Sequence, residues 1–95
     1  MNLKITFRHM EHTKSIDGRI REKLENLAKK HFSIDANVDW TCLVEHDQHI
    51  ASVNVLDRGH DFHAKASSDN MYKTIDQVIG KIEKQIEGQE HHPGH

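Results

Sequence analysis

Hydrophobic residues alternate with polar ones in four segments of the chain and recur at three- and four-residue steps in two others. Alternation is typical of strands with one buried face, and the longer step is typical of helices with one buried stripe. The alternating segments are 2–8, 38–44, 51–55 and 62–66, and the helical segments are about 14–30 and about 69–87. The pattern therefore predicts the order β-α-β-β-β-α.

Polar segments interrupt this pattern where the chain must turn or where a helix begins. The predicted turns are 33–37, Asp47-Gln48 and 57–60, which hold the residue types that favour turns. A side-chain oxygen placed just before a helix accepts a hydrogen bond from a backbone N–H of the first turn. The predicted caps are Thr13 for the first helix and Ser68 or Asp69 for the second.

The two helices each carry a single apolar stripe, so both should cover the buried face of one sheet. We expect an α+β fold, a two-layer sandwich with a four-stranded mixed sheet and two helices on one face. The helical crossover makes the first two strands parallel if they are neighbours, and the hairpins make the other pairs antiparallel. Residues 1–88 should form a single domain, and residues 89–95 a flexible, His-rich tail.

Both helices sort their charged residues by sign around the apolar stripe. A helix that separates its charges presents a basic strip to an anionic partner, and two such strips suggest one composite basic surface if the fold joins them. The basic bands are Arg19, Lys23 and Lys30 in the first helix and Lys73, Lys81 and Lys84 in the second. Acidic residues on the other sides are Glu22 and Glu25, and Asp76, Glu83 and Glu87.

Net charge adds a restriction to this picture. The 95-residue chain has a formal charge of −2, but residues 1–35 carry a balance of +3 and residues 36–95 a balance of −5. Nonspecific binding to nucleic acid should therefore be weak, because it depends on the number of phosphates that are neutralised. A structured partner with a shaped anionic cavity fits this distribution better than free duplex does.

Catalytic and membrane functions find little support in the residues. No apolar run is long enough to span a bilayer and no signal pattern is present, so we expect a cytoplasmic protein. Glycine-rich phosphate loops and nucleophilic triads are not visible. Cys42 and Trp40 fit the core pattern of a strand, and Tyr72 stands at the edge of an apolar stripe, where it either closes the core or contacts RNA. We expect no enzyme, no cofactor and no small-molecule substrate.

The ten histidines suggest metal binding only weakly. Neighbours three residues apart on a turn and strand tend to lie on opposite faces, and a metal site needs converging ligands. We therefore expect no physiological metal site, although the tail histidines can chelate adventitiously. A further hypothesis is that histidine protonation near pH 6 strengthens anion binding. The clusters considered are His46 with His49, His60 with His63, and His91 with His92 and His95.

Several segments resemble the ribosome hibernation-promoting factors, also called ribosome-associated translation inhibitors or sigma-54 modulation proteins. The resemblance covers the chain to about Glu87 and is most specific in the second helix. That family has the β-α-β-β-β-α order reached above from the pattern. The matching segments are the opening 1–6, Met10-Glu11-x-Thr13, Arg21-Glu22-Lys23-Leu24-x-x-Leu27, and Asp69-Asn70-Met71-Tyr72-x-x-Ile75-Asp76 with Lys81 and Lys84-Gln85 beyond it.

The resemblance implies a stationary-phase stress protein that binds the small ribosomal subunit. It would lie in the decoding channel, block binding of messenger RNA and transfer RNA, and inhibit translation without catalysis. With no long C-terminal extension, the chain is similar to the short form, which promotes ribosome pairing together with a separate modulation factor. The RNA-binding residues are expected to be Arg21, Lys23, Lys81 and Lys84 from the resemblance, with Arg19, Lys30 and Lys73 added from the basic bands.

Two alternatives stay open at this point. One is another RNA-binding α+β module, for instance a binder of double-stranded RNA. The other is a metal-binding protein built on the histidines. Comparable affinity for naked duplex would favour the first, and stoichiometric zinc uptake without residues 89–95 would favour the second.

Overall fold

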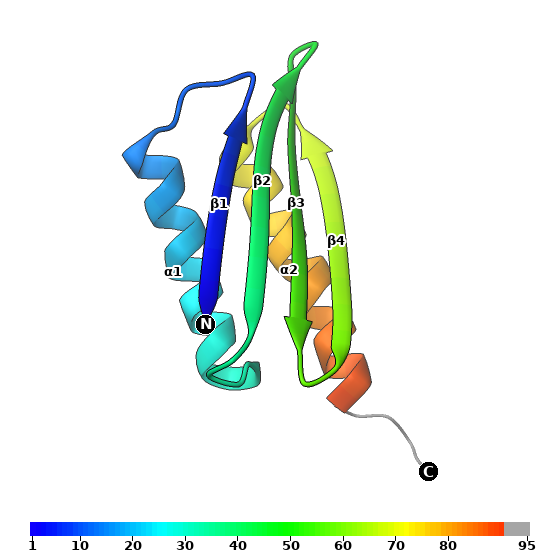
Figure 1. Ribbon diagram of the computed structural model, residues 1–95. Coiled ribbons are helices and arrows are strands. Elements are labelled where there is room, and N and C mark those ends of the chain that lie inside the picture. Colours follow the sequence, from blue (N-terminus) through cyan, green and yellow to red (C-terminus); the bar gives the residue numbers. More distant parts are fainter. Residues whose placement is uncertain (91–95) are drawn as a thin grey trace.

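The computed structural model describes residues 1–90 and has the predicted order of strands and helices (Figure 1). The predicted segments agree with the observed strands and helices to within a few residues at their ends. Helix α2 continues to Glu90, so the first two residues of the expected tail are helical, and 91–95 lie outside the described residues. The elements are β1 (Asn2–Arg8), α1 (Lys14–His31), β2 (Asn37–Glu45), β3 (Gln48–Asp57), β4 (His60–Ser68) and α2 (Met71–Glu90).

The four strands form one mixed sheet in the order β1-β2-β3-β4. β1 pairs with β2 in parallel, and the β2–β3 and β3–β4 pairs are antiparallel. A parallel pair needs a crossover connection, which α1 provides, whereas antiparallel pairs can be joined by tight hairpins. The predicted sheet is confirmed.

The β2–β3 turn lies one residue earlier than the sequence predicts. Glu45 pairs with Gln48 across the strands, so His46 and Asp47 form the two-residue loop. Their φ angles are 50° and 63°. Positive φ at both positions is the signature of a type I′ turn, whose twist suits a hairpin. The predicted Asp47-Gln48 turn is wrong because His adopts positive φ more readily than most residues, which lets the turn include His46.

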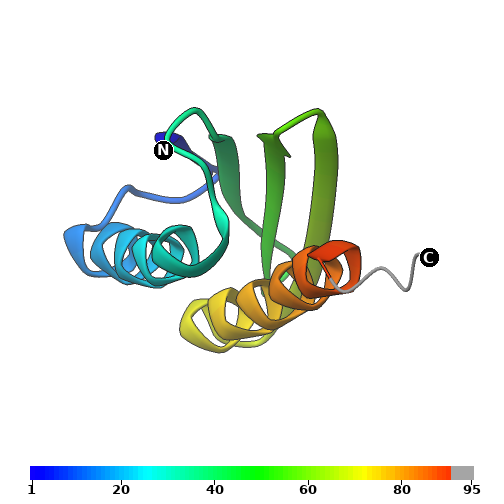
Figure 2. The same ribbon diagram turned by 90° about the horizontal axis from the view of Figure 1, so that it is seen from below.

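Both helices pack on one face of the sheet, and the core lies between the two layers (Figures 1 and 2). Trp40 is fully buried at its centre and donates a hydrogen bond from Nε1 to Sγ of Cys42, 3.3 Å away. Burial raises the pKa of the Cys42 thiol to about 11, so it stays protonated at neutral pH. The core assignments of both residues are confirmed. The helix residues buried in this core are Ile16, Ile20, Leu24, Leu27, Met71, Ile75, Val78, Ile82 and Ile86.

The helices begin at side-chain caps, one predicted correctly and one not. Oγ1 of Thr13 accepts a hydrogen bond from the Ile16 N–H at 3.2 Å, as expected. In α2 the cap is Asn70, whose Oδ1 accepts from the N–H groups of Tyr72 and Lys73 at 2.9 and 3.3 Å. The predicted cap at Ser68 or Asp69 is wrong because the helix starts later, at Met71.

Candidate nucleic-acid interface

Helix α1 directs its basic band towards α2. Arg19, Lys23 and Lys30 are spaced so that they share the side of α1 next to its buried stripe. Lys23 lies 3.8 Å from a carboxylate oxygen of Asp76, and Lys30 lies 3.8 Å from one of Glu83. The basic band of α1 therefore faces the acidic flank of α2.

The two basic bands do not join into the composite surface that the sequence suggested. Because α1 and α2 lie side by side on the sheet, one flank of each helix faces the other helix (Figure 2). The flanks that meet have opposite signs, and the lysines of α2 lie outside this contact, with Lys73 and Lys84 on the exposed outer side of α2 and Lys81 beside β4. Exposed ion pairs of this kind contribute little to stability. Their main effect here is to reduce the positive field between the helices.

At the N-terminal end of α2, Tyr72 joins the two helices. The Arg19 guanidinium carbon lies 5.6 Å from the centre of the Tyr72 ring, a cation–π arrangement. The Tyr72 hydroxyl is hydrogen-bonded to the Ser15 hydroxyl. About 37% of Tyr72 remains exposed. It therefore closes the contact between the helices and keeps part of its surface at the solvent.

Arg21 lies away from the other predicted RNA-binding residues of α1. It forms an ion pair with Asp17, 2.5 Å from Nε to Oδ1, and His12 lies 2.8 Å from the other oxygen of the same carboxylate. The hydrogen bonds from His12 and Arg21 lower the pKa of Asp17. Arg21 also lines a recess beside the start of β1, together with Met1 and Leu3. Its place is on the flank of α1 that is remote from α2.

The three lysines of α2 differ in their surroundings. Lys73 and Lys84 are exposed, and no ion pair to them is found among residues 1–90. Lys81 instead donates a hydrogen bond from Nζ to the Lys65 carbonyl of β4, at 2.8 Å. The Lys81 ammonium group therefore already has a hydrogen-bond acceptor at the edge of the sheet. Lys73 and Lys84 are the α2 lysines whose ammonium groups are most accessible to a phosphate.

Gln85 reinforces the same sheet edge. Its Nε2 donates to the His63 carbonyl at 2.6 Å, and its Oε1 accepts from the His63 N–H at 3.2 Å. The amide thus occupies both backbone groups of an outer residue of β4, as a neighbouring strand would. An edge strand with unpaired backbone groups invites association with other chains, so this cover is protective.

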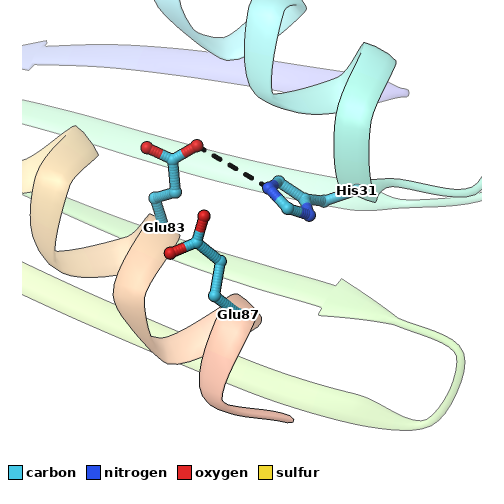
Figure 3. A group of neighbouring side chains, drawn as sticks. All are labelled: His31, Glu83 and Glu87. Atoms are coloured by element: carbon cyan, nitrogen blue, oxygen red, sulfur yellow. Dashed lines mark ion pairs between the residues drawn. The ribbon is translucent and has the colours of Figure 1, made fainter. Parts of the chain in front are cut away.

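The structure does not bring the described histidine pairs into a group of potential metal ligands. It does bring together another such group, which the sequence did not predict. His60 and His63 occupy opposite faces of β4, as expected from their spacing. By contrast, His31, Glu83 and Glu87 place one ligand atom each within 4.8 Å of one another (Figure 3). The i,i+4 spacing of the two glutamates was visible in the sequence, but the approach of α1 to α2 was not. The tail histidines lie outside the described residues.

Comparison with known protein families shows which family this chain is related to. Residues 3–91 match the family described as "Sigma 54 modulation protein / S30EA ribosomal protein". The match spans both helices and nearly the whole sheet. The chain belongs to this family. Membership confirms the resemblance seen in the sequence and places the chain among ribosome-associated hibernation factors, a class of translation inhibitors and not an enzyme family.

Solved structures share the fold at low sequence identity. A ribosomal subunit interface protein from Coxiella burnetii superimposes with a TM-score of 0.84 at 24% identity, covering 95% of this chain and 98% of that one. The N-terminal domain of Protein Y from Thermus thermophilus gives a TM-score of 0.79 at 18% identity, with 90% and 96% covered. No curated protein sequence matches the chain. Among the described residues, no helix is long and apolar enough to cross a membrane.

Proposed function

We propose that this protein binds the small ribosomal subunit in the decoding channel, where it blocks messenger RNA and transfer RNA. In stationary phase it would promote ribosome hibernation in the cytoplasm, through pairing of ribosomes with the help of a separate modulation factor. The observation that carries this proposal is the family match over residues 3–91. Occupancy alone would inhibit translation, so the mechanism needs no reaction.

The surface of the helices supports an electrostatic contact with ribosomal RNA. Lys73 and Lys84 are exposed on α2, and Lys30 keeps about 67% of its side chain exposed beside Glu83. Such ammonium groups contact phosphates and fix the position of a protein on folded RNA without reading its sequence. The proposed RNA-binding set remains Arg19, Arg21, Lys23, Lys30, Lys73, Lys81 and Lys84, with Lys73 and Lys84 as its most accessible α2 members.

Cosedimentation with purified small subunits tests the location. We expect saturable, salt-sensitive binding that initiator transfer RNA reduces, because both would occupy the same channel. Binding that is indifferent to transfer RNA would place the protein elsewhere on the subunit. A complete lack of binding at low salt would contradict the proposed partner.

A pair of lysine substitutions tests the surface. Lys73→Ala with Lys84→Ala should weaken subunit binding and lower the salt slope of log Kobs by about 1 for each lost phosphate contact. The matched control is Lys4→Ala, which removes an exposed lysine from β1 on the sheet face that no helix covers. All variants should unfold at nearly the same denaturant concentration, since exposed charges contribute little to stability. Unchanged binding of the double variant would show that this side of α2 does not contact the subunit.

A further inference from the structure

The group formed by His31, Glu83 and Glu87 lies where the end of α1 meets the last turns of α2 (Figure 3). His31 is the last residue of α1, and the two glutamates are four residues apart on α2, so both carboxylates point to the same side of that helix. All three ligand atoms lie within 4.8 Å of one another. Two elements distant in the sequence thus supply one nitrogen and two oxygen donors to one point.

The surroundings of this group favour a cation. The His31 side chain is only 10% exposed, and its Nε2 lies 3.6 Å from Oε2 of Glu83, so a ring nitrogen and a carboxylate oxygen already face each other. Glu83 and Glu87 carry like charges at i,i+4, an arrangement that destabilises a helix by itself. The Lys30 ammonium group lies 3.8 Å from Oε2 of Glu83, so it compensates the charge of the two glutamates only from a distance. A divalent ion at this point would neutralise both carboxylates at once.

The donor set selects the kind of ion. Imidazole nitrogen favours zinc and other transition ions over Mg²⁺ and Ca²⁺, which take oxygen ligands. Zinc binds His nitrogen and carboxylate oxygen at about 2.0–2.2 Å, which in tetrahedral geometry sets ligand atoms about 3.3 Å apart. The separation of up to 4.8 Å therefore has to shrink by roughly 1.5 Å, within reach of rotamer changes at the exposed Glu87. Three protein ligands leave the fourth position to water.

We propose that His31, Glu83 and Glu87 bind one Zn²⁺ ion that links the C-terminal end of α1 to α2. This inference goes beyond ribosome binding and does not depend on it. The ion would take over the role of Lys30 beside Glu83 and leave that ammonium group unpaired from this carboxylate. Substituting Lys30→Gln should accordingly strengthen zinc binding, because it removes a cation that competes for the same oxygen.

The test uses the full chain with His91, His92 and His95 each replaced by Asn, so that the tail cannot chelate. Zn²⁺ titration against a chromophoric chelator should show one ion per chain, and Co²⁺ should give the intense visible bands of a four-coordinate site. In this background, Glu87→Gln and His31→Gln should each weaken zinc binding at least tenfold. Glu22→Gln, which removes an exposed carboxylate from α1, should leave the affinity unchanged.

Thermal unfolding supplies a second readout. Saturating Zn²⁺ should raise the Tm of the tail-substituted chain, because a ligand that binds only the folded state stabilises it. The Glu87→Gln variant should fold normally, since Glu87 is exposed, yet show no such rise. Loss of all zinc uptake on replacing the tail histidines would overturn the proposal. Equal affinity of the parent and the Glu87→Gln chain would overturn it as well.

Discussion

Asp57 shows how one buried carboxylate fixes the path of a connection. The sequence predicts it as a turn residue, but its side chain points inward from the end of β3 and holds Ser33, in the segment between α1 and β2. It accepts from the Ser33 N–H at 2.9 Å and from the Ser33 hydroxyl at 2.5 Å. A contact between residues 24 positions apart depends on the assembled fold, so no local pattern could predict it.

The pKa of Asp57 links this contact to pH. Burial alone would raise that pKa, but the hydrogen bonds from Ser33, with Arg58 and His60 nearby, lower it below its usual value of 3.8. A lowered folded-state pKa means that the stabilisation is present above the unfolded-state pKa and is lost as pH falls through the folded-state pKa. The contribution of Asp57 should therefore be complete at neutral pH, begin to decline near pH 4, and be lost as pH falls further through the folded-state pKa.

Asp57→Asn should lower the free energy of unfolding at pH 7 by about 1–3 kcal/mol, because it weakens a charge-assisted pair of hydrogen bonds. Urea unfolding at pH 7 and pH 3 measures the effect. The difference between the two proteins should be smaller at pH 3, where the wild-type carboxyl is increasingly protonated. Asp47→Asn, in the exposed hairpin turn, serves as the control and should change little at either pH. A difference that grows on acidification would contradict this account of Asp57.

Helix α2 has two roles as an element, since it covers the core and also closes the outer edge of β4. Its apolar stripe was readable from the sequence, because a helical period of 3.6 residues fixes which positions share a face. The edge contacts of Lys81 and Gln85 were not, because polar residues outside the stripe can point to solvent or to a neighbouring strand equally well. The cap was misplaced at Ser68 or Asp69 because Asn70 is an equally good capping residue, and the sequence alone does not choose among the three.

Gln85→Ala should expose the edge of β4. It removes two hydrogen bonds to the His63 backbone, and we expect a loss of about 1–3 kcal/mol in the free energy of unfolding. Hydrogen exchange of the His63 amide should become faster, and self-association at high concentration should increase. Gln77→Ala changes an exposed glutamine of the same helix and is the matched control. An unaltered His63 exchange rate would show that water replaces Gln85 without cost.

The order of elements, the sheet and both buried stripes could be predicted for the whole molecule, because each follows from periodicity within a segment. The relation of the basic bands could not. It depends on which flank of α1 meets which flank of α2, and that is settled only when both helices pack on the sheet. The group of His31 with two glutamates escaped prediction for the same reason. The sorting of charges by sign was visible along each helix, but whether the two basic bands join depends on how the helices pack together.

The pairing of unlike flanks bears on what kind of RNA the protein can bind. Lys23 and Lys30 each have an acidic neighbour on α2, and the molecule as a whole carries a charge of −2. Binding to a regular duplex depends mainly on how many phosphates are neutralised, and each contact made by a partly compensated lysine adds less to it. In the proposed channel site, phosphates would surround the bound protein on several sides, so dispersed lysines such as Lys73 and Lys84 would contribute together.

We therefore expect naked double-stranded RNA of about 16 base pairs, long enough for a duplex-binding domain, to bind far more weakly than small subunits at moderate salt. Competition measures this directly, with labelled protein bound to subunits and increasing amounts of duplex added. Asp76→Asn with Glu83→Gln is an informative variant, because it removes the acidic neighbours of Lys23 and Lys30. It should raise duplex affinity by a larger factor than subunit affinity. Efficient displacement of the unmodified protein by duplex would instead favour a general RNA-binding module, because a shaped channel would then add nothing to binding.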